Sequence, residues 1–296
     1  MRPRQWTKNL LLFASFLFTV NQLWRPFTPS MWTALARTSI AFLAFSVLSS
    51  GVYLLNDVRD IEQDRRHPQK RHRPLASGAI TAPMAVVLAA LLLIVGLGTS
   101  LVLRPLFFVV AASYLLMQLC YTLWWKHVVI LDVFIIAVGF VMRAVSGAIV
   151  LDVYISPWLY IVTFLGALFL GLCKRRHELE LLDSDAASHR RILAEYSLPL
   201  LDQMISIVTA STIMAYSLYT FTSDNLPRNH LMMLTIPHVL YGLFRYLYLA
   251  YRRNQGGSPE EVLLRDRPLR LAILLWVGTA AVILLVTRSP LVAASF

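Results

Sequence analysis

Residues 31–64 read MWTALARTSIAFLAFSVLSSGVYLLNDVRDIEQD, an apolar run that ends in a cluster of acids. The run extends from residue 31 to residue 55, close to the ~20 residues that an α-helix needs to cross the hydrocarbon of a bilayer. The polar cluster that follows it contains Asn56, Asp57, Asp60 and Asp64. This stretch therefore predicts a membrane-spanning helix that places a polar site at one membrane surface.

The composition of the whole chain also favours a membrane protein. Hydrophobic residues make up 57% of the chain and charged residues 15%, whereas a soluble domain carries about 25% charged residues. We expect an all-α polytopic membrane protein, a single transmembrane domain over residues 1–296 with about nine spans. The expected spans are residues 9–26, 31–55, 82–103, 105–124, 128–150, 157–173, 198–221, 230–251 and 268–287. Prolines such as Pro29, Pro83 and Pro105 lie at their junctions, where the first turn of a helix tolerates them.

Lysine and arginine are distributed unevenly between the two ends of these spans. One side of the membrane receives the N-terminus, residues 59–73, Lys126, residues 174–191 and residues 252–270. The opposite side receives only Arg25, Arg104, Arg228 and Arg288. The first side is therefore predicted to be cytoplasmic, with the N-terminus inside and the C-terminus outside. The net charge of +11 comes from basic residues that cluster in the predicted cytoplasmic loops. We therefore expect the membrane as a partner and no nucleic acid.

The acidic cluster has the pattern of a magnesium site. If the helix runs on to about His67, where Pro68 would end it, a turn of about 100° per residue places its polar side chains within a quarter of the helix circumference. Hard oxygen ligands on one stripe suit Mg²⁺. We assign metal binding to Asn56, Asp60 and Asp64, and catalysis to Asp57, Asp60 and Asp64. The alternative is a solvated helix end whose acids pair with Arg59, Arg65 and Arg66.

A basic loop follows the acids directly, and it predicts phosphate binding. Arginine forks grip phosphate oxygens in pairs, and lysine supplies a point charge. The candidate ligands are Arg66, Lys70, Arg71 and Arg73. The alternative is that these residues only anchor the topology.

Further candidates lie beyond this loop. The sixth span ends in Lys174-Arg175-Arg176-His177-Glu178, and we assign Lys174, Arg175 and Glu178 to substrate binding; a topology anchor is again the alternative. Tyr121 and Lys126 flank the interfacial tryptophans after the fourth span. Arginines within spans, which are Arg37, Arg143 and Arg245, are costly unless they face a polar environment. We expect Arg143 to face the site or, alternatively, to neutralise a buried acid such as Asp132.

These residues resemble a known family. Asn56-Asp57-x-x-Asp60-x-x-x-Asp64 after the second span is similar to the first aspartate-rich motif of the UbiA superfamily of intramembrane prenyltransferases. The stretches Lys70–Gly78, Tyr121–Lys126 and Gly139–Gly147 are also similar to that family, and the resemblance covers essentially the whole chain. It implies a UbiA-type bundle of transmembrane helices with active-site loops that face the cytoplasm.

The chain departs from the family pattern at one point. Most members carry a second acidic motif after the sixth span, whereas this chain has Lys174-Arg-Arg-His-Glu178-Leu. Together with the opening Arg2-Pro-Arg-Gln-Trp-Thr-Lys-Asn9, this departure resembles a bacterial branch that acts in the inner membrane. That branch transfers 5-phosphoribosyl from phosphoribosyl pyrophosphate to decaprenyl phosphate, a polyprenyl phosphate, and releases pyrophosphate. The product is a precursor of the arabinan in cell-wall arabinogalactan.

Two other functions remain open at this stage. The first is an aromatic prenyltransferase, for example one of quinone biosynthesis. The second is a carrier or flippase for lipid phosphates, although a carrier has no evident need for an acidic stripe that binds a metal. The sequence leaves the polyprenyl length and the oligomeric state open, a homo-oligomer included.

Overall fold

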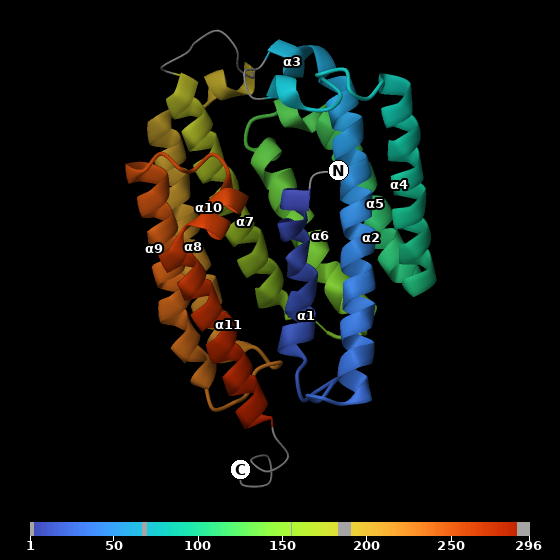
Figure 1. The fold of residues 1–296 in the computed structure, drawn as a ribbon. Coiled ribbons are helices and arrows are strands. Elements are labelled where there is room, and N and C mark those ends of the chain that lie inside the picture. Colours follow the sequence, from blue (N-terminus) through green and yellow to red (C-terminus); the bar gives the residue numbers. More distant parts are fainter. Residues whose placement is uncertain (1–2, 67–69, 155, 183–190, 289–296) are drawn as a thin grey trace.

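The computed structural model describes residues 3–66, 70–154, 156–182 and 191–288, which fold as a bundle of helices (Figure 1). The longer helices are α2 (Pro29–Arg59), α4 (Ala82–Leu103), α5 (Pro105–Leu123), α6 (Leu131–Leu151), α7 (Pro157–Leu182), α8 (Leu198–Thr222), α9 (Ile236–Arg252) and α11 (Arg267–Thr287). The shorter α-helices are α1 (Phe13–Phe18), α3 (Ile61–Arg66) and α10 (Pro259–Arg265). The 3₁₀ helices are η1 (Pro3–Leu12), η2 (Lys70–His72), η3 (Trp125–His127), η4 (Arg191–Glu195) and η5 (Leu231–Thr235).

Seven of the described helices are long and apolar enough to cross a membrane, namely α2, α4, α5, α6, α7, α8 and α11. The predicted all-α polytopic fold is confirmed, but the count of nine spans is not. The two remaining apolar stretches are divided between elements: residues 9–26 between η1 and the short α1, and residues 230–251 between η5 and α9. The predicted position of proline is also found, since α2, α4, α5, α8, α9, α10 and α11 each have proline in the first turn.

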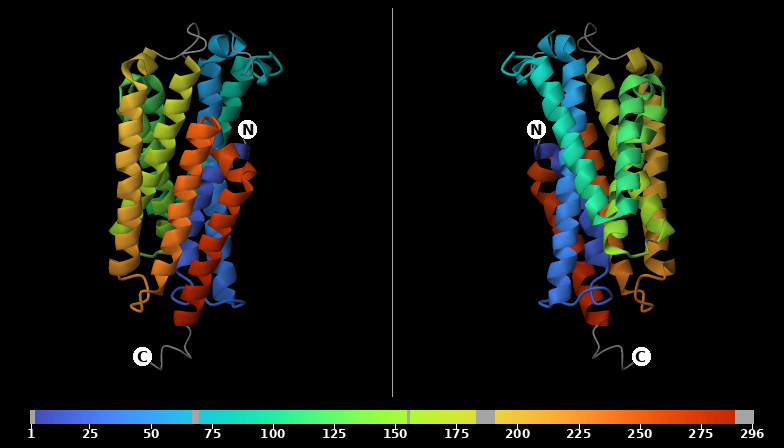
Figure 2. Two further views of the ribbon diagram at one scale, coloured as in Figure 1. Left: turned by 90° about the vertical axis from the view of Figure 1, so that its left-hand side faces the viewer. Right: turned by 90° about the vertical axis from the view of Figure 1, so that its right-hand side faces the viewer.

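The long helices run alongside one another and are joined at the two ends of the bundle (Figure 2). We call the end that carries α3, η2 and η3, at the top of Figure 1, the charged end. Large apolar side chains point outward from several helices; Ile94 on α4, Leu116 on α5 and Leu274 on α11 are each more than 60% exposed. A soluble protein rarely exposes contiguous apolar surface of this kind, whereas lipid covers it in a membrane.

Small residues allow close packing where helices meet. α2 packs most extensively on α4, and a Cβ added at Gly51 or Gly96 would lie 3.0 Å from Leu93 or Leu48 across this interface. η1 and α1 run through the middle of the bundle, where both contact α2 and α6 (Figure 1). At Gly147 of α6, an added Cβ would collide with the carbonyl oxygen of Leu12. Gly147 therefore allows the backbone of η1 to lie against α6.

The Gly147→Ala variant tests this close approach. We expect the substitution to lower the free energy of unfolding by about 1–3 kcal/mol, because the carbonyl at Leu12 is backbone and cannot rotate away. The measurement is the thermal unfolding temperature in detergent. Gly98→Ala on α4 is the matched control, since nothing lies within 4 Å of its added Cβ; alanine is favoured over glycine within a helix by roughly 0.5–1 kcal/mol. Equal unfolding temperatures for the two variants would contradict the proposed contact.

Candidate active site

The polar side chains Asn56, Asp57, Asp60 and Asp64, which we call the acidic stripe, lie where α2 meets α3 at the charged end (Figure 1). The predicted single helix is instead divided in two, with the break at Asp60, and His67 lies outside the described residues. Backbone hydrogen bonds nevertheless cross the break. Asp60 N donates to Asn56 O at 3.0 Å, and Asp64 N donates to Asp60 O at 2.8 Å. These helical i to i−4 bonds keep the stripe largely in phase.

Arg73, from the loop after η2, is the counter-ion of two of these acids. Its Nη1 lies 2.5 Å from Oδ2 of Asp64 and 3.2 Å from Oδ1 of Asp57. Asp64 is only 3% exposed, and a carboxylate buried this deeply is costly unless a cation pairs with it. Arg65, a cation of the alternative solvated-helix interpretation, instead bonds Glu62 on the surface. The acids are therefore held by a residue from another segment of the chain.

The end of α5 and η3 supply further contacts to the acidic stripe. Lys126 Nζ lies 3.9 Å from Oδ1 of Asp60. Thr122 Oγ1 donates to Oδ1 of Asn56 at 2.8 Å, and Arg59 Nη1 donates to the carbonyl oxygen of Thr122 at 2.7 Å. Lys126 was predicted from the sequence as a phosphate ligand. The structure places it in η3, next to Asp60 of the acidic stripe.

The oxygen atoms of the acidic stripe have the chemistry of a magnesium site. Mg²⁺ usually takes one or two carboxylates and completes its shell with water and substrate phosphates. Within the described part of the chain, no three His, Cys, Asp or Glu are grouped so that they could hold a metal ion by themselves. Arg73 already places a cation between Asp57 and Asp64. The donors therefore suit Mg²⁺ by their chemical type, but the described side chains are not assembled into a metal site by themselves.

A buried ion pair joins α6 to α7 close to the charged end. Arg175 Nε donates to Oδ2 of Asp132 at 2.6 Å, and its Nη1 pairs with Glu178. Tyr196, from the segment before α8, donates to Oδ1 of Asp132 at 2.9 Å and accepts from Ile130 N at 2.7 Å. Both Arg175 and Asp132 are at most 2% exposed. The predicted Arg175 is thus bonded to two acids of the protein and positions Glu178.

Arg143 lies in the core with no carboxylate among its described partners. Its Nε donates to Oδ1 of Asn9 at 2.8 Å, Nη1 to the carbonyl of Gly139 at 2.7 Å and Nη2 to the hydroxyl of Tyr114 at 2.7 Å. The guanidinium also lies 5.0 Å from the centroid of the Tyr114 ring, an arrangement that stabilises a cation. The alternative that Arg143 neutralises Asp132 is wrong, because Asp132 is bonded to Arg175 instead.

The other two arginines within spans are in different environments. Arg37 is exposed on the surface of α2. Arg245 pairs with Asp266 at 2.8 Å, at the start of α11. The hydrogen bond from Arg245 holds the pKa of Asp266 below its ordinary value. Neither arginine contacts the acidic stripe through a described bond.

Tyr121 and Lys174 both lie near the buried Arg175. Tyr121 is close enough to Arg175 to interact with it electrostatically. Lys174 has the same relation to Glu178 and Arg175. The structure therefore connects the α5 end of the site to the basic end of α7.

The basic loop is only partly placed against the acids. Arg71 is exposed, and its Nε lies 3.3 Å from Nε2 of His72. The side chains of Arg66 and Lys70 lie outside the part that the structure describes. Of the four predicted cations, Arg73 is the one that the described contacts join to the stripe.

Several residues of this network were not selected from the sequence as site residues. Asn9 bridges Arg143 to Ser46 of α2, since its Nδ2 donates to Ser46 Oγ at 2.9 Å. Asn9 belongs to the N-terminal stretch that resembles one family branch, which is a usable signal. Tyr196 and Thr122 carry no comparable signal, because a tyrosine before a helix or a threonine within one is common.

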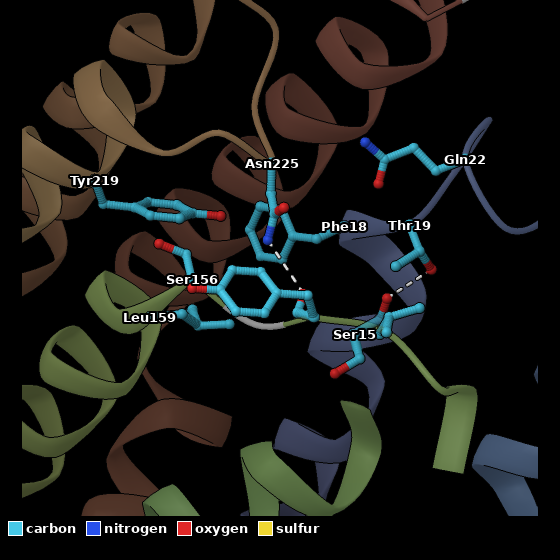
Figure 3. A pocket seen from close by; sticks show the side chains of 10 residues that line it. Ser15, Phe18, Thr19, Gln22, Ser156, Leu159, Tyr219 and Asn225 are labelled. Carbon is cyan, nitrogen blue, oxygen red and sulfur yellow. Dashed lines mark hydrogen bonds between the residues drawn. The ribbon is translucent and has the colours of Figure 1, made fainter. Parts of the chain in front are cut away.

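A separate cavity of about 240 Å³ (Figure 3) is lined by the end of α1 and the α6–α7 connection, which lie at the opposite end of the bundle from the charged end (Figure 1). Its walls come from α1, the α6–α7 connection and the end of α8, and they include Ser15, Phe18, Tyr219 and Asn225. No charged side chain lines it among the described residues, so it does not suit a pyrophosphate.

The chain is similar to known proteins over most of its length. Residues 12–264 match the model of the UbiA prenyltransferase family. The chain is 35% identical over 290 residues to a decaprenyl-phosphate phosphoribosyltransferase of Mycolicibacterium smegmatis, covering 94% of this chain and 89% of that protein. It is 31% identical over 285 residues to a protein of the same name from Corynebacterium glutamicum, covering 94% and 83%.

A solved structure has the same fold. A UbiA homologue from Archaeoglobus fulgidus, bound to GPP and Mg²⁺, superposes with a TM-score of 0.71 at 16% identity, covering 96% of this chain and 97% of that one. The match to the family model, the full-length relatives and the shared bundle agree. This chain belongs to the UbiA prenyltransferase family.

Proposed function

We propose that this protein transfers 5-phosphoribosyl from phosphoribosyl pyrophosphate to a polyprenyl phosphate, with decaprenyl phosphate as the expected acceptor. The observation that carries the proposal is the similarity over 94% of the chain to relatives that bear the name of this activity. The basic end of α7 supports it, because Lys174 and Arg175 stand where most members of the superfamily carry a second acidic motif, which helps to hold a single prenyl diphosphate through Mg²⁺. The product would serve as a precursor for cell-wall arabinan in the arabinogalactan.

The proposed reaction is a displacement at C1 of the ribose. The bond from C1 to the pyrophosphate oxygen breaks, and pyrophosphate leaves with the electron pair. An oxygen of the lipid phosphate forms the new bond to C1 from the opposite face. A phosphate monoester is largely ionised near pH 7, since its second pKa is about 6, so no strong general base is required. Positioning and electrostatic stabilisation would carry most of the catalysis.

The acidic stripe is the proposed leaving-group site. Asn56, Asp60 and Asp64 would hold Mg²⁺, which when bound supplies positive charge to the departing pyrophosphate. Asp57 and Asp64 keep Arg73 at the stripe, where its remaining N–H groups can grip phosphate oxygens. Lys126 adds a second cation from η3. The donor chemistry and the fold shared with a Mg²⁺-bound homologue support this assignment.

The same network argues against the two rival functions. A carrier has no leaving group, so it has no evident need for three carboxylates that are held in place by cations from other segments. An aromatic prenyltransferase binds one diphosphate, whereas the proposed substrates together bring a pyrophosphate and two phosphate monoesters.

We also propose that the protein lies in a bacterial inner membrane with the charged end in the cytoplasm, where phosphoribosyl pyrophosphate is available.

Substitutions in the acidic stripe test the metal role. We expect Asp60→Asn and Asp64→Asn each to reduce kcat/KM by about 100- to 1000-fold, the effect of losing one electrostatic stabiliser of the transition state. Excess chelator should abolish the wild-type activity, and Mg²⁺ should restore it. Glu62→Gln is the matched control, since the exposed side chain of Glu62 lies on the same short helix as Asp64 but bonds Arg65. Full activity in chelator, or an equal loss in Glu62→Gln, would rule out this role.

A transfer assay in membrane vesicles tests the reaction and the orientation together. Inverted vesicles with Mg²⁺, labelled phosphoribosyl pyrophosphate and polyprenyl phosphate should move label into the lipid phase. Sealed right-side-out vesicles should not, because phosphoribosyl pyrophosphate is too highly charged to cross the bilayer. Neither kind of vesicle should transfer geranyl groups from geranyl diphosphate to 4-hydroxybenzoate. Robust prenylation without labelled lipid would establish the first rival function instead.

A further inference from the structure

η1 has a geometry that aligns its side chains in rows. It is ten residues long, whereas 3₁₀ helices rarely exceed three or four residues. With three residues per turn, side chains at i and i+3 eclipse one another. Trp6, Asn9 and Leu12 therefore share one row, and Gln5 and Lys8 share the next.

The first row fixes η1 against the neighbouring helices. Trp6 Nε1 donates to Ser50 Oγ at 3.1 Å, and Asn9 Nδ2 donates to Ser46 Oγ at 2.9 Å, one turn apart on α2. The backbone at Leu12 lies against Gly147 of α6. These contacts at three successive turns determine the rotation of η1, so the direction of the second row is also determined.

The second row faces α10 and the basic end of α7. Gln5 Nε2 donates to Oε1 of Glu260 at 2.6 Å. Lys8, one turn further, lies close enough to both Glu260 and Lys174 for electrostatic interaction. Burial raises the pKa of Glu260, but the charge of Lys8, together with hydrogen bonds and the charge of Lys174, brings that pKa below its ordinary value. Gln5 thus bonds Glu260 directly, and the charges of lysines from two different segments act on the same acid.

We propose that Lys8, beside Lys174, binds a phosphate monoester of a substrate, and that Glu260 is the internal counter-ion which this phosphate displaces. The proposal rests on phosphoribosyl transfer, whose donor and acceptor each carry one phosphate monoester. Arg175 is already bonded to Asp132 and Glu178, whereas the acid that interacts with both lysines is Glu260, and an entering anion can take its place. The exchange replaces one anion by another and leaves neither lysine without a counter-charge.

Binding of two substrate fragments tests the proposal without turnover. Ribose 5-phosphate and farnesyl phosphate are titrated separately into the purified protein by calorimetry. Lys8→Ala should weaken binding of one fragment about 10- to 150-fold, as expected for losing a charge-assisted hydrogen bond. Lys8→Arg should retain most of that affinity. Glu260→Gln should tighten binding of the same fragment, because it removes the competing charge.

The arms of the experiment identify the source of the phosphate. A loss confined to ribose 5-phosphate assigns Lys8 to the donor, and a loss confined to farnesyl phosphate assigns it to the lipid. Arg265→Ala, which removes an exposed charge from α10 itself, is the matched control and should change neither affinity.

Four outcomes would overturn the proposal. They are unchanged affinities in Lys8→Ala, an equal loss for both fragments, weaker binding in Glu260→Gln, and failure of the wild-type protein to bind either fragment. A different outcome separates the two proposals. If Lys8→Ala weakens fragment binding but the wild-type protein transfers no phosphoribosyl, the phosphate site stands and the proposed function is wrong.

Discussion

A charge that lies among membrane helices must find its partner within the protein, because lipid cannot solvate it. This constraint accounts for the arrangement of polar residues in the bundle. Asp132 and Arg175 are both buried and bond each other, and the pair joins α6 to α7. Arg143 is equally buried, and Asn9, Gly139 and Tyr114 take up its N–H groups. Removing one partner of such a pair typically costs about 3–5 kcal/mol, so these contacts strongly constrain the positions of the helices.

The same constraint organises the charged end, where the proposed substrates would bind. The carboxylates of the acidic stripe are paired with Arg73 and Lys126, and Lys8 and Lys174 surround Glu260. In the proposed function, a substrate phosphate would replace an internal carboxylate as the partner of a cation. Because each cation would then keep a counter-charge, binding would not leave a buried cation unpaired. The charged side chains are thus held in place by the protein itself, as the proposed electrostatic catalysis requires.

Local patterns in the sequence predicted the features that depend on neighbouring residues. The lengths of the apolar runs identified the long helices, prolines marked their beginnings, and the spacing from Asn56 to Asp64 located the acidic stripe. The rest depends on tertiary contacts that spacing does not encode. Nothing in residues 3–12 taken alone indicates a 3₁₀ helix, which is held by Ser46, Ser50 and the space at Gly147. Likewise, the partner of Arg175 is 43 residues away in the chain, so Asp132 could not be chosen over other acids.

The most direct test of the central claim is the binding of inorganic pyrophosphate to the purified protein, measured by calorimetry with and without Mg²⁺. If the acidic stripe is a metal-assisted leaving-group site, the wild-type protein should bind pyrophosphate tightly only with Mg²⁺. Asp60→Asn should lose that dependence together with the affinity. Pyrophosphate binding of equal strength in excess chelator, unchanged in Asp60→Asn, would contradict the account.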